Sequence, residues 1–504
     1  MSRRVQVSLD VPIDEARERA TLVLAELGRG RFGELAFDVR AVDEHESILE
    51  LYAAPPVRVP YFGWFVRAVA WWVARGDLRD ALAGVRAGPA DAAPPRRRRR
   101  FMVPPAPFSA AQAASLATVA AVGALANFGG SLLTQSGSAV IQDFHRSDAA
   151  LSYALALTRI GVLLALVACS LADRYGRRRL LLYGLAGICV ANAAAAFAPN
   201  FTVFTASQVL VRGLVEATLV VAAIVAIEEA PEGARAFALS MLGLALGVGF
   251  GISVVLLPLA DLGANGWRLM FLLSAVALLA LPGLARHLPE SRRYARLSER
   301  PARRRLRDRE TRYGRRFLVL GAVGFLLSVF SAPSTQLTNR YLIHIHHFSN
   351  ADVAGFRALT AGVPGFLGIV LAGHLAETRG RRWVGVVALV VATVSLMAFF
   401  LIGGSPLWVA ETIYIVAAAS AGVAVGALDV ELFPTEVRGS TSGVLLVCGV
   451  AGSVTGLLLT AVLEGPVGLG PAIALCGLAS LLAALLLPFV PETAAQRLDD
   501  ISPT

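Results

Sequence analysis

Long apolar runs dominate this chain from Ala111 onward and limit its fold more than any other feature. Most runs hold about 20–28 residues, and a helix that rises 1.5 Å per residue needs about 20 residues to cross a hydrocarbon core of ~30 Å. The runs occupy residues 111–141, 150–172, 179–199, 202–227, 237–260, 267–286, 317–341, 351–375, 382–403, 406–429, 439–462 and 467–489. The sequence therefore predicts an all-α membrane protein with twelve transmembrane helices.

The composition agrees with this prediction. Hydrophobic residues make up 56% of the 504 residues and charged residues 16%, whereas a soluble globular chain carries about 25% charge. This balance excludes a soluble enzyme, a disordered chain and a secreted disulfide scaffold. The four cysteines all fall within apolar runs, so we expect buried thiols rather than disulfides at Cys169, Cys189, Cys448 and Cys476.

Residues 1–88 differ from the rest of the chain and predict a small α+β domain of unknown role. The expected elements are a strand at Val5–Leu9, a helix at Pro12–Leu27, strands at Leu35–Val42 and Ser47–Tyr52, and a helix at Tyr61–Gly84. Trp64, Trp71 and Trp72 lie in the last helix, where they either pack on the sheet or enter the membrane interface. A Pro- and Arg-rich linker at 89–110 joins this domain to the first span.

The distribution of arginine predicts the orientation of the chain. An even number of spans places both termini on one side, and placing that side in the cytoplasm puts 40 of the 46 basic residues there. Only Arg146, Arg268 and Arg340 fall on the opposite side. We therefore expect a multi-pass protein of the cytoplasmic (inner) membrane with cytoplasmic N- and C-termini. Basic runs such as Arg96–Arg100 flank spans and would meet anionic lipid headgroups, which argues against a nucleic-acid partner.

Two loop motifs from the first half of the chain recur in the second half. The paired segments are Leu171–Arg179 with Gly373–Arg382, and Glu228–Arg235 with Glu431–Arg438. Asp173 aligns with Glu377 at an offset of 204 residues, and Pro231 aligns with Pro434 at an offset of 203. The common offset predicts two homologous six-helix bundles related as parallel repeats, at 111–286 and 317–490. A basic loop at 287–316 joins the bundles, and a tail at 491–504 follows the second bundle.

The repeated loops have the chemistry of a cytoplasmic latch. Each places an acid at the end of a span and arginines after a turn, so ion pairs to neighbouring spans can close one side of the protein. The alternative is that these arginines only set the topology. The candidate gating residues are Asp173, Arg174, Gly176, Arg177, Arg178, Glu228, Glu229, Arg235, Glu290, Gly373, Glu377, Gly380, Arg381, Arg382, Glu431, Pro434, Arg438 and Glu492.

These motifs resemble those of the major facilitator superfamily, over about 390 residues from Ala111. The loop after the second span is similar to the family's G-x-L-a-D-r-x-G-r-r signature, with Cys169 in place of the first Gly. The segments Gly266–Arg268, Leu288–Arg293, Glu431–Gly439 and Pro491–Thr493 resemble the sugar-porter, organic-ion and metabolite:proton symporter branches. The resemblance implies alternating access of two bundles around a central cavity. We expect no cofactor and expect the protein to function as a monomer.

Glycines in spans 5 and 11 fit this expectation, since small residues let helices approach closely and slide. They are Gly243, Gly247, Gly249 and Gly251, and Gly443, Gly449, Gly452 and Gly456. Span 5 lacks the G-P-x-x-G-G element typical of drug:proton antiporters, which disfavours drug efflux.

Charged residues inside the spans are the main candidates for a substrate or proton site, because an ionisable group at the membrane midplane costs at least ~2.5–3.5 kcal/mol. Arg159 lies in span 2, and Arg212 precedes Glu216 by one turn in span 4. In one interpretation Arg212 binds a substrate anion or modulates Glu216, and Glu216 carries the coupling proton. In the other, Arg212 and Glu216 form a fixed structural pair, and Arg159 forms hydrogen bonds to the backbone. Arg357 and Glu411 lie nearer the outer ends of their spans, where snorkelling to the interface could satisfy them.

Polar residues in spans 1 and 7 complete the candidate site. Span 1 carries Asn127 and Gln135 but no acid, unlike many proton-coupled sugar porters, and span 7 ends in a polar patch with Gln336 and Asn339. That patch lines the cavity or caps the helix at the outer surface. We expect His344, His346 and His347 to lie in a solvated outer loop rather than to bind a metal.

The sequence thus favours a secondary active transporter for a small organic anion or metabolite, with a proton as candidate coupling ion. The alternatives are a drug or metabolite exporter and a transporter-like receptor that signals through residues 1–88. The sequence shows neither a catalytic triad nor a nucleotide-binding loop, so we expect no enzyme activity, and transport is powered by gradients. The expected partners are the solute, protons and the lipid bilayer.

Overall fold

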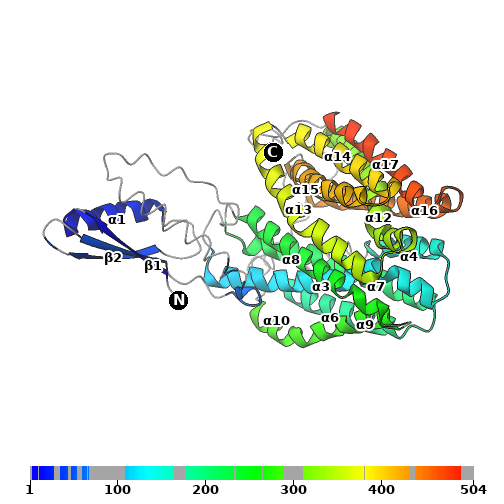
Figure 1. Cartoon of the computed structure of the whole chain (residues 1–504), viewed down its shortest axis with the longest axis horizontal. Helices are drawn as coiled ribbons and strands as arrows, with labels where there is room; N and C mark the ends of the chain where they lie inside the picture. Colours follow the sequence, from blue (N-terminus) through cyan, green and yellow to red (C-terminus); the bar gives the residue numbers. More distant parts are fainter. Residues whose placement is uncertain are drawn as a thin grey trace. The chain divides into compact units, whose positions relative to one another are not determined.

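The computed structural model describes the polypeptide at residues 3–9, 11–27, 35–41, 43, 47–53, 59–64, 66, 68, 108–163, 176–231, 234–263, 265–288, 310–379, 381–431 and 438–489 (Figure 1). The chain divides into two compact units, which we describe separately. The first contains Met1–Gly123, Ala222–Ala245 and Gly283–Ala295, and the second contains Ala124–Val221, Leu246–Pro282 and Arg296–Thr504.

The first unit includes the predicted α+β fold. Strands β1 (Arg3–Leu9), β2 (Leu35–Ala41) and β3 (Ser47–Ala53) form an antiparallel sheet in the order β1-β3-β2, and α1 (Ile13–Leu27) connects β1 to β2. Helix α1 packs on β2 and β3.

The small core of this fold comes from alternating apolar residues. Val39 pairs with Leu49 across the sheet, and both are buried, as are Ala16 and Ala20 of α1. Most of the helix predicted at Tyr61–Gly84 lies outside the described residues, as do Trp71 and Trp72.

Helical elements overlap all twelve predicted spans, although residues 164–172 of the second span lie outside the described residues. The first six are α3 (Ala110–Asp143), α4 (Asp148–Gly161), α6 (Arg177–Ala196), α7 (Phe201–Glu229), α8 (Arg235–Val255) with η1 (Leu257–Asp261), and α9 (Gly266–Ser274) with η2 (Ala275–Ala280) and α10 (Leu281–His287). The second six are α12 (Glu310–His346), α13 (Asn350–Arg379), α14 (Arg381–Leu401), α15 (Pro406–Glu431), α16 (Arg438–Val467), and α17 (Leu469–Leu486) with η3 (Leu487–Phe489). Within the described ranges, nine helices or runs of helices are long and apolar enough to cross a membrane. The other three expected spans are α4, α13 and α15.

Helix α12 is longer than predicted and corrects the placement of two histidines. His344 and His346 lie in its last turn rather than in a loop, and only His347 follows it, with φ of +56°. The helix continues because Tyr341 and Leu342 are buried in the core at this end, so packing outweighs the polarity of the histidines. The described residues contain no group of three side chains arranged to hold a metal ion.

Close helix packing at glycines repeats between the two bundles. A Cβ atom on Gly249 of α8 would overlap the carbonyl oxygen of Ala124 in α3, and one on Gly452 of α16 would overlap that of Phe325 in α12. Gly452 follows Gly249 by 203 residues, the offset that also separates the repeated loop motifs. This close approach confirms the predicted packing role for these two glycines. By contrast, Gly243, Gly247 and Gly251 have open space around them.

Aromatic clusters hold one end of each bundle together. In the first bundle, Trp267 of α9 makes edge-on contacts with Phe204 and Phe271, at ring-centroid distances of 5.4 and 5.5 Å. In the second, Tyr341 and Phe399 pack around Phe400, and Phe356 packs on Trp408 at 4.6 Å.

Contacts between the bundles involve α4 with α16 and α13 with η1. Asn350, the first residue of α13, donates a hydrogen bond to Asp261 of η1 at 2.6 Å. These contacts fix α4, α12, α13 and α16 close together and so determine which polar side chains can meet.

Candidate functional site

Polar side chains from α3, α4, α12 and α13 connect the two bundles inside the second unit. They are Gln135, Arg159, Gln336, Asn339 and Arg357, and we call them the inter-bundle network. All five were candidates from sequence alone.

One branch of the network joins α3, α12 and α13. Asn339 Nδ2 donates to the side-chain oxygen of Gln135 at 2.6 Å and to its backbone carbonyl at 3.1 Å. Arg357 Nε in turn donates to Asn339 Oδ1 at 2.8 Å. Because Asn339 uses both ends of its buried amide, its orientation is fixed by its neighbours. The Nε2 donor of Gln135 is buried without an acceptor in the described part of the chain.

A second branch joins α4 to α12. With the Gln336 amide oriented so that its oxygen faces α4, Oε1 accepts hydrogen bonds from Arg159 Nε at 2.9 Å and from Nη2. Gln336 and Asn339 are three residues apart and therefore lie on the same face of α12. The polar end predicted for span 7 thus faces the other bundle and does not serve as a surface cap.

Charged residues surround the network. Arg212 and Glu216 of α7 form an ion pair at 2.5 Å, as their spacing predicted, and both interact electrostatically with Arg159. Their side chains remain 27% and 22% exposed. On the other side, Arg357 interacts electrostatically with Glu411 of α15.

The charges of this region do not cancel. Three arginines, Arg159, Arg212 and Arg357, stand against two acids, Glu216 and Glu411, which leaves one excess positive charge. Arg159 forms no ion pair within the described residues and is held by a neutral amide. An uncompensated guanidinium that is only half-buried is a natural partner for an anion.

Glu411 does not snorkel to a surface. Its side chain is 3% exposed, and Oε2 has no hydrogen-bond partner in the described part of the protein. The expectation that Glu411 is satisfied at an interface is therefore wrong, because the packing of α13 and α14 on α15 encloses it.

Asn127 occupies a different environment from the rest of the candidates. Its side chain donates to the backbone carbonyl of Leu246 in α8 at 2.9 Å. This bond ties α3 to α8 within the first bundle, so Asn127 has a packing contact and not a place in the inter-bundle network.

The sequence did not predict a second ion pair, which is more deeply buried than Arg212–Glu216. Arg340, which was assigned to the outer loops, is 2% exposed and pairs with Glu464 of α16 through both nitrogens of its guanidinium fork, with Nη1–Oε2 at 3.2 Å. The assignment was wrong because α12 continues beyond residue 341 and holds Arg340 within the bundle. The sequence contains a signal for this pair, since Glu464 is the only acid between Glu436 and Glu492.

The Trp-Arg sequence before span 6 also has a structural role. Trp267 Nε1 and Arg268 Nη2 both donate to Asp143 Oδ2, at 3.2 and 2.8 Å, and Arg268 Nη1 donates to the carbonyl of Ala196 at 2.6 Å. These bonds join the ends of α9, α3 and α6.

Only some of the predicted gating residues can be placed. Gly176 precedes α6 with φ of +91°, a conformation that side chains other than glycine rarely adopt, so the predicted tight turn is confirmed there. Arg177 and Glu229 are buried, and Arg382 Nη1 donates to the carbonyl of Pro488 at 3.3 Å. Arg178 and Glu228 lie in the described parts of α6 and α7. The helical backbone includes Arg235, Gly373, Glu377, Arg381, Glu431 and Arg438, while Asp173, Arg174, Glu290, Gly380, Pro434 and Glu492 lie outside the described residues. The latch therefore stays a prediction.

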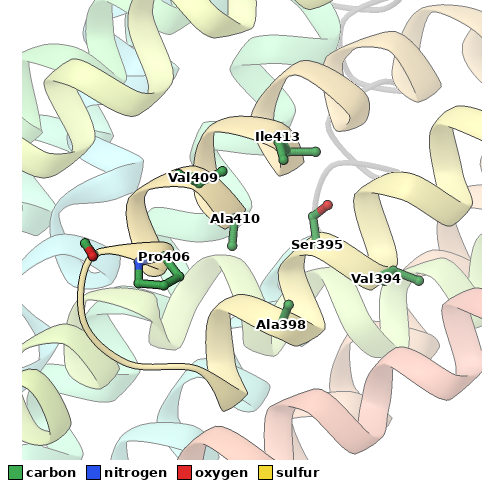
Figure 2. A pocket seen from close by; sticks show the side chains of 8 residues that line it. Val394, Ser395, Ala398, Pro406, Val409, Ala410 and Ile413 are labelled. Atoms are coloured by element: carbon green, nitrogen blue, oxygen red, sulfur yellow. The ribbon is translucent and has the colours of Figure 1, made fainter.

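Two cavities lie between α14 and α15, and no member of the network lines them. One has a volume of about 500 Å³ and is lined by residues such as Val394, Ala398 and Val409 (Figure 2). The other has a volume of about 660 Å³ and includes Trp383 and Val387. Their apolar lining suits acyl chains of the bilayer better than a polar solute.

Comparisons with known proteins agree with the fold. The structure of the xylose transporter XylE from E. coli in an inward-open conformation is similar, with a TM-score of 0.62, 16% identity, and coverage of 77% of this chain and 98% of that one. A bacterial homologue of the human lysosomal transporter Spinster has a TM-score of 0.60, 17% identity and coverage of 74% and 96%. The nucleoside transporter NupG has a TM-score of 0.61, 12% identity and coverage of 74% and 98%. At these identities the likeness shows the fold alone.

A search of curated protein sequences finds no match. The family model of the Major Facilitator Superfamily matches residues 115–430. The match covers more than half of the chain and includes both copies of the repeated loop after spans 2 and 8, so this chain belongs to the major facilitator superfamily.

Proposed function

We propose that this secondary transporter carries a small organic anion across the cytoplasmic membrane and binds its carboxylate at Arg159. The observation that carries the proposal is the excess positive charge of this region, together with the half-buried Arg159 guanidinium, which forms no ion pair among the described residues and is held by the neutral amide of Gln336. The proposed orientation, with both termini in the cytoplasm, rests on the arginine distribution.

Arg159 lies where both bundles contribute to the site. It extends from α4 in the first bundle to Gln336 on α12 in the second, so an anion bound there touches both. The Nε2 donor of Gln135, which has no acceptor among the described residues, supplies a further hydrogen bond to a second oxygen of the solute. A hydrogen bond to a charged group contributes about 1.5–3 kcal/mol, which corresponds to roughly 10–100-fold in affinity.

A neutral polyhydroxylated solute is the second candidate. Gln135, Gln336 and Asn339 place three amides around the site, and amides suit sugar hydroxyls as donors and acceptors. The structural likeness to a xylose transporter agrees with this candidate. The excess positive charge is the reason to favour the anion.

Thermal unfolding of the purified, detergent-solubilised full chain tests the proposal. Unfolding is followed at increasing concentrations of sodium lactate, sodium benzoate or xylose, since a ligand that binds the folded state raises the midpoint by mass action. We expect a carboxylate to stabilise the wild type and to bind Arg159→Gln about 10–100-fold more weakly. Arg146→Gln is the matched control, because Arg146 is exposed and outside the network.

Two results would contradict anion transport. One is a wild type that no carboxylate stabilises, and the other is an Arg159→Gln variant that binds the carboxylate as tightly as the wild type does. Stabilisation by xylose alone would favour the sugar candidate. The Arg159→Lys variant, which keeps the charge but loses the planar fork, should bind with intermediate affinity.

A further inference from the structure

We propose that Glu411 takes up the coupling proton, and that the bound substrate anion replaces the Glu411 carboxylate as the electrostatic partner of Arg357. This inference rests on the proposed anion transport. It assigns the proton to α15 in the second bundle, whereas the sequence had suggested Glu216 in the first.

Helix packing and electrostatics relate Glu411 to Arg357, and hydrogen bonds relate Arg357 to the inter-bundle network. Glu411 lies on α15, and Arg357 lies on α13, which packs against it. Within the described residues only Nε of Arg357 has a hydrogen-bond acceptor, namely Asn339 Oδ1, so the two Nη groups can donate to an anion. Asn339 is in turn bonded to Gln135 across the bundle interface.

Burial makes an ionised Glu411 dependent on Arg357. A carboxylate removed from water costs several kcal/mol unless it is paired and hydrogen-bonded, and Oε2 of Glu411 has no donor among the described residues. The other groups that face it are few. The second helix packed on α15 is α14, which carries no titratable side chain from Trp383 to Leu401. Among the described side chains of α15, Tyr414 is the titratable group that interacts with Glu411.

Charge balance around Arg357 then couples the binding of the substrate anion to the binding of the proton. The Arg357 guanidinium stabilises one negative charge, which belongs to Glu411 when the site is empty. A substrate carboxylate held at Arg159 that also accepts hydrogen bonds from the Arg357 Nη groups takes over this role, and Glu411 binds a proton from solvent because its counterion is now shared. One anion and one proton therefore enter the site together, and each strengthens the binding of the other by the same factor.

Glu216 suits this role less well. It already pairs with Arg212 at 2.5 Å one turn away on the same helix, and its side chain is 22% exposed. Glu411 is 3% exposed, and its Oε2 has no hydrogen-bond partner among the described residues. Its electrostatic partner Arg357 is bonded to Asn339, which in turn bonds Gln135 of the other bundle, so an anion between the bundles can act on Glu411 through Arg357.

Proton uptake on anion binding tests the inference directly. Sodium lactate or sodium benzoate is added near neutral pH to weakly buffered, detergent-solubilised protein with a pH-indicator dye. We expect about one proton per bound anion in the wild type and less than about a tenth of that in Glu411→Gln. Asp38→Asn removes an acid that is 54% exposed and should behave like the wild type.

The pH dependence of anion binding gives a second readout, which a purely structural role of Glu411 would not change. In the wild type, the apparent Kd should rise about tenfold per pH unit once Glu411 ionises in the unliganded protein, because one proton is linked to binding. In Glu411→Gln, the Kd should be independent of pH and equal to the wild-type value at low pH. A Kd that stays pH-dependent in this variant overturns the inference.

The outcomes separate this inference from the proposal on which it rests. If no carboxylate binds the wild type, both fail. If a carboxylate binds through Arg159 but no proton is taken up, or if Glu411→Gln still takes up one proton, only the role of Glu411 is wrong. Should Glu411→Gln not fold, infrared difference spectra of the wild type decide, since anion binding must then produce a new protonated-carboxyl band.

Discussion

Neutralising Glu464 should destabilise the protein more than any exposed charge change. The Arg340 side chain is 2% exposed and that of Glu464 is 17% exposed, and two N–H···O bonds link them between α12 and α16. Glu464→Gln keeps the shape of the side chain and removes its charge. The variant therefore leaves a buried guanidinium without its carboxylate.

The expected loss follows from this burial. Removing one partner of a buried ion pair costs about 3–5 kcal/mol, because the remaining charge stays desolvated. The glutamine oxygen still accepts one hydrogen bond, so we expect the lower end, about 3 kcal/mol. The double variant Arg340→Gln with Glu464→Gln leaves no buried charge, so it should lose less than Glu464→Gln alone.

Unfolding by SDS of the detergent-solubilised protein, followed by tryptophan fluorescence, measures these changes. Arg146→Gln is the exposed control and should change the free energy of unfolding by no more than about 0.5 kcal/mol. The reasoning is refuted if Glu464→Gln unfolds like the control. It is also refuted if the losses in the two single variants add up in the double variant, since a true ion pair gives a coupling energy.

Two further changes have predictable effects on stability. Gly456→Ala should cost about 1–3 kcal/mol in the same SDS assay because a methyl group there meets the carbonyl of Val329 in α12, whereas Gly465→Ala, with open space around it, should cost little. Leu49→Ala should cost about 2–5 kcal/mol in the small α+β fold, because Leu49 is fully buried on the central strand. The Leu49→Ala variant of the full chain should therefore be cut faster by trypsin within residues 3–53. Asp38→Ala is the exposed control, and the expectation is contradicted if trypsin cuts both variants at the same rate.

Among the site residues, the sequence predicts an ion pair within one helix from the spacing of its charges, but it does not predict contacts between helices. Arg212 and Glu216 are one turn apart, so their pairing followed from the sequence. Both arginines outside this pair bond amides on α12. Arg159 bonds Gln336, which lies 177 residues later in the chain, and Arg357 bonds Asn339, which lies 18 residues earlier. No local pattern selects Gln336 or Asn339 from the other polar residues at the end of span 7.

The predicted position of charged residues relative to the membrane is wrong where a helix extends beyond its apolar run. The run ends near residue 341, so Arg340 and the following histidines were assigned to the outside, but α12 extends to His346. Hydropathy measures the polarity of each segment alone. It misses a buried charge whose carboxylate comes from another helix, as Glu464 does for Arg340.

The sequence by itself determined the membrane class, the two-bundle repeat, the superfamily resemblance and the order of elements in the α+β fold. These properties depend on run length, periodicity and motif spacing, which are written along one chain. Only the tertiary structure decided that Gln135, Arg159, Gln336, Asn339 and Arg357 form one network, that Asn127 does not join it, and that Glu411 is buried beside Arg357. The physical reason is that these contacts depend on how each helix is rotated and where it crosses its neighbours, and close packing at positions such as Gly249 and Gly452 sets both.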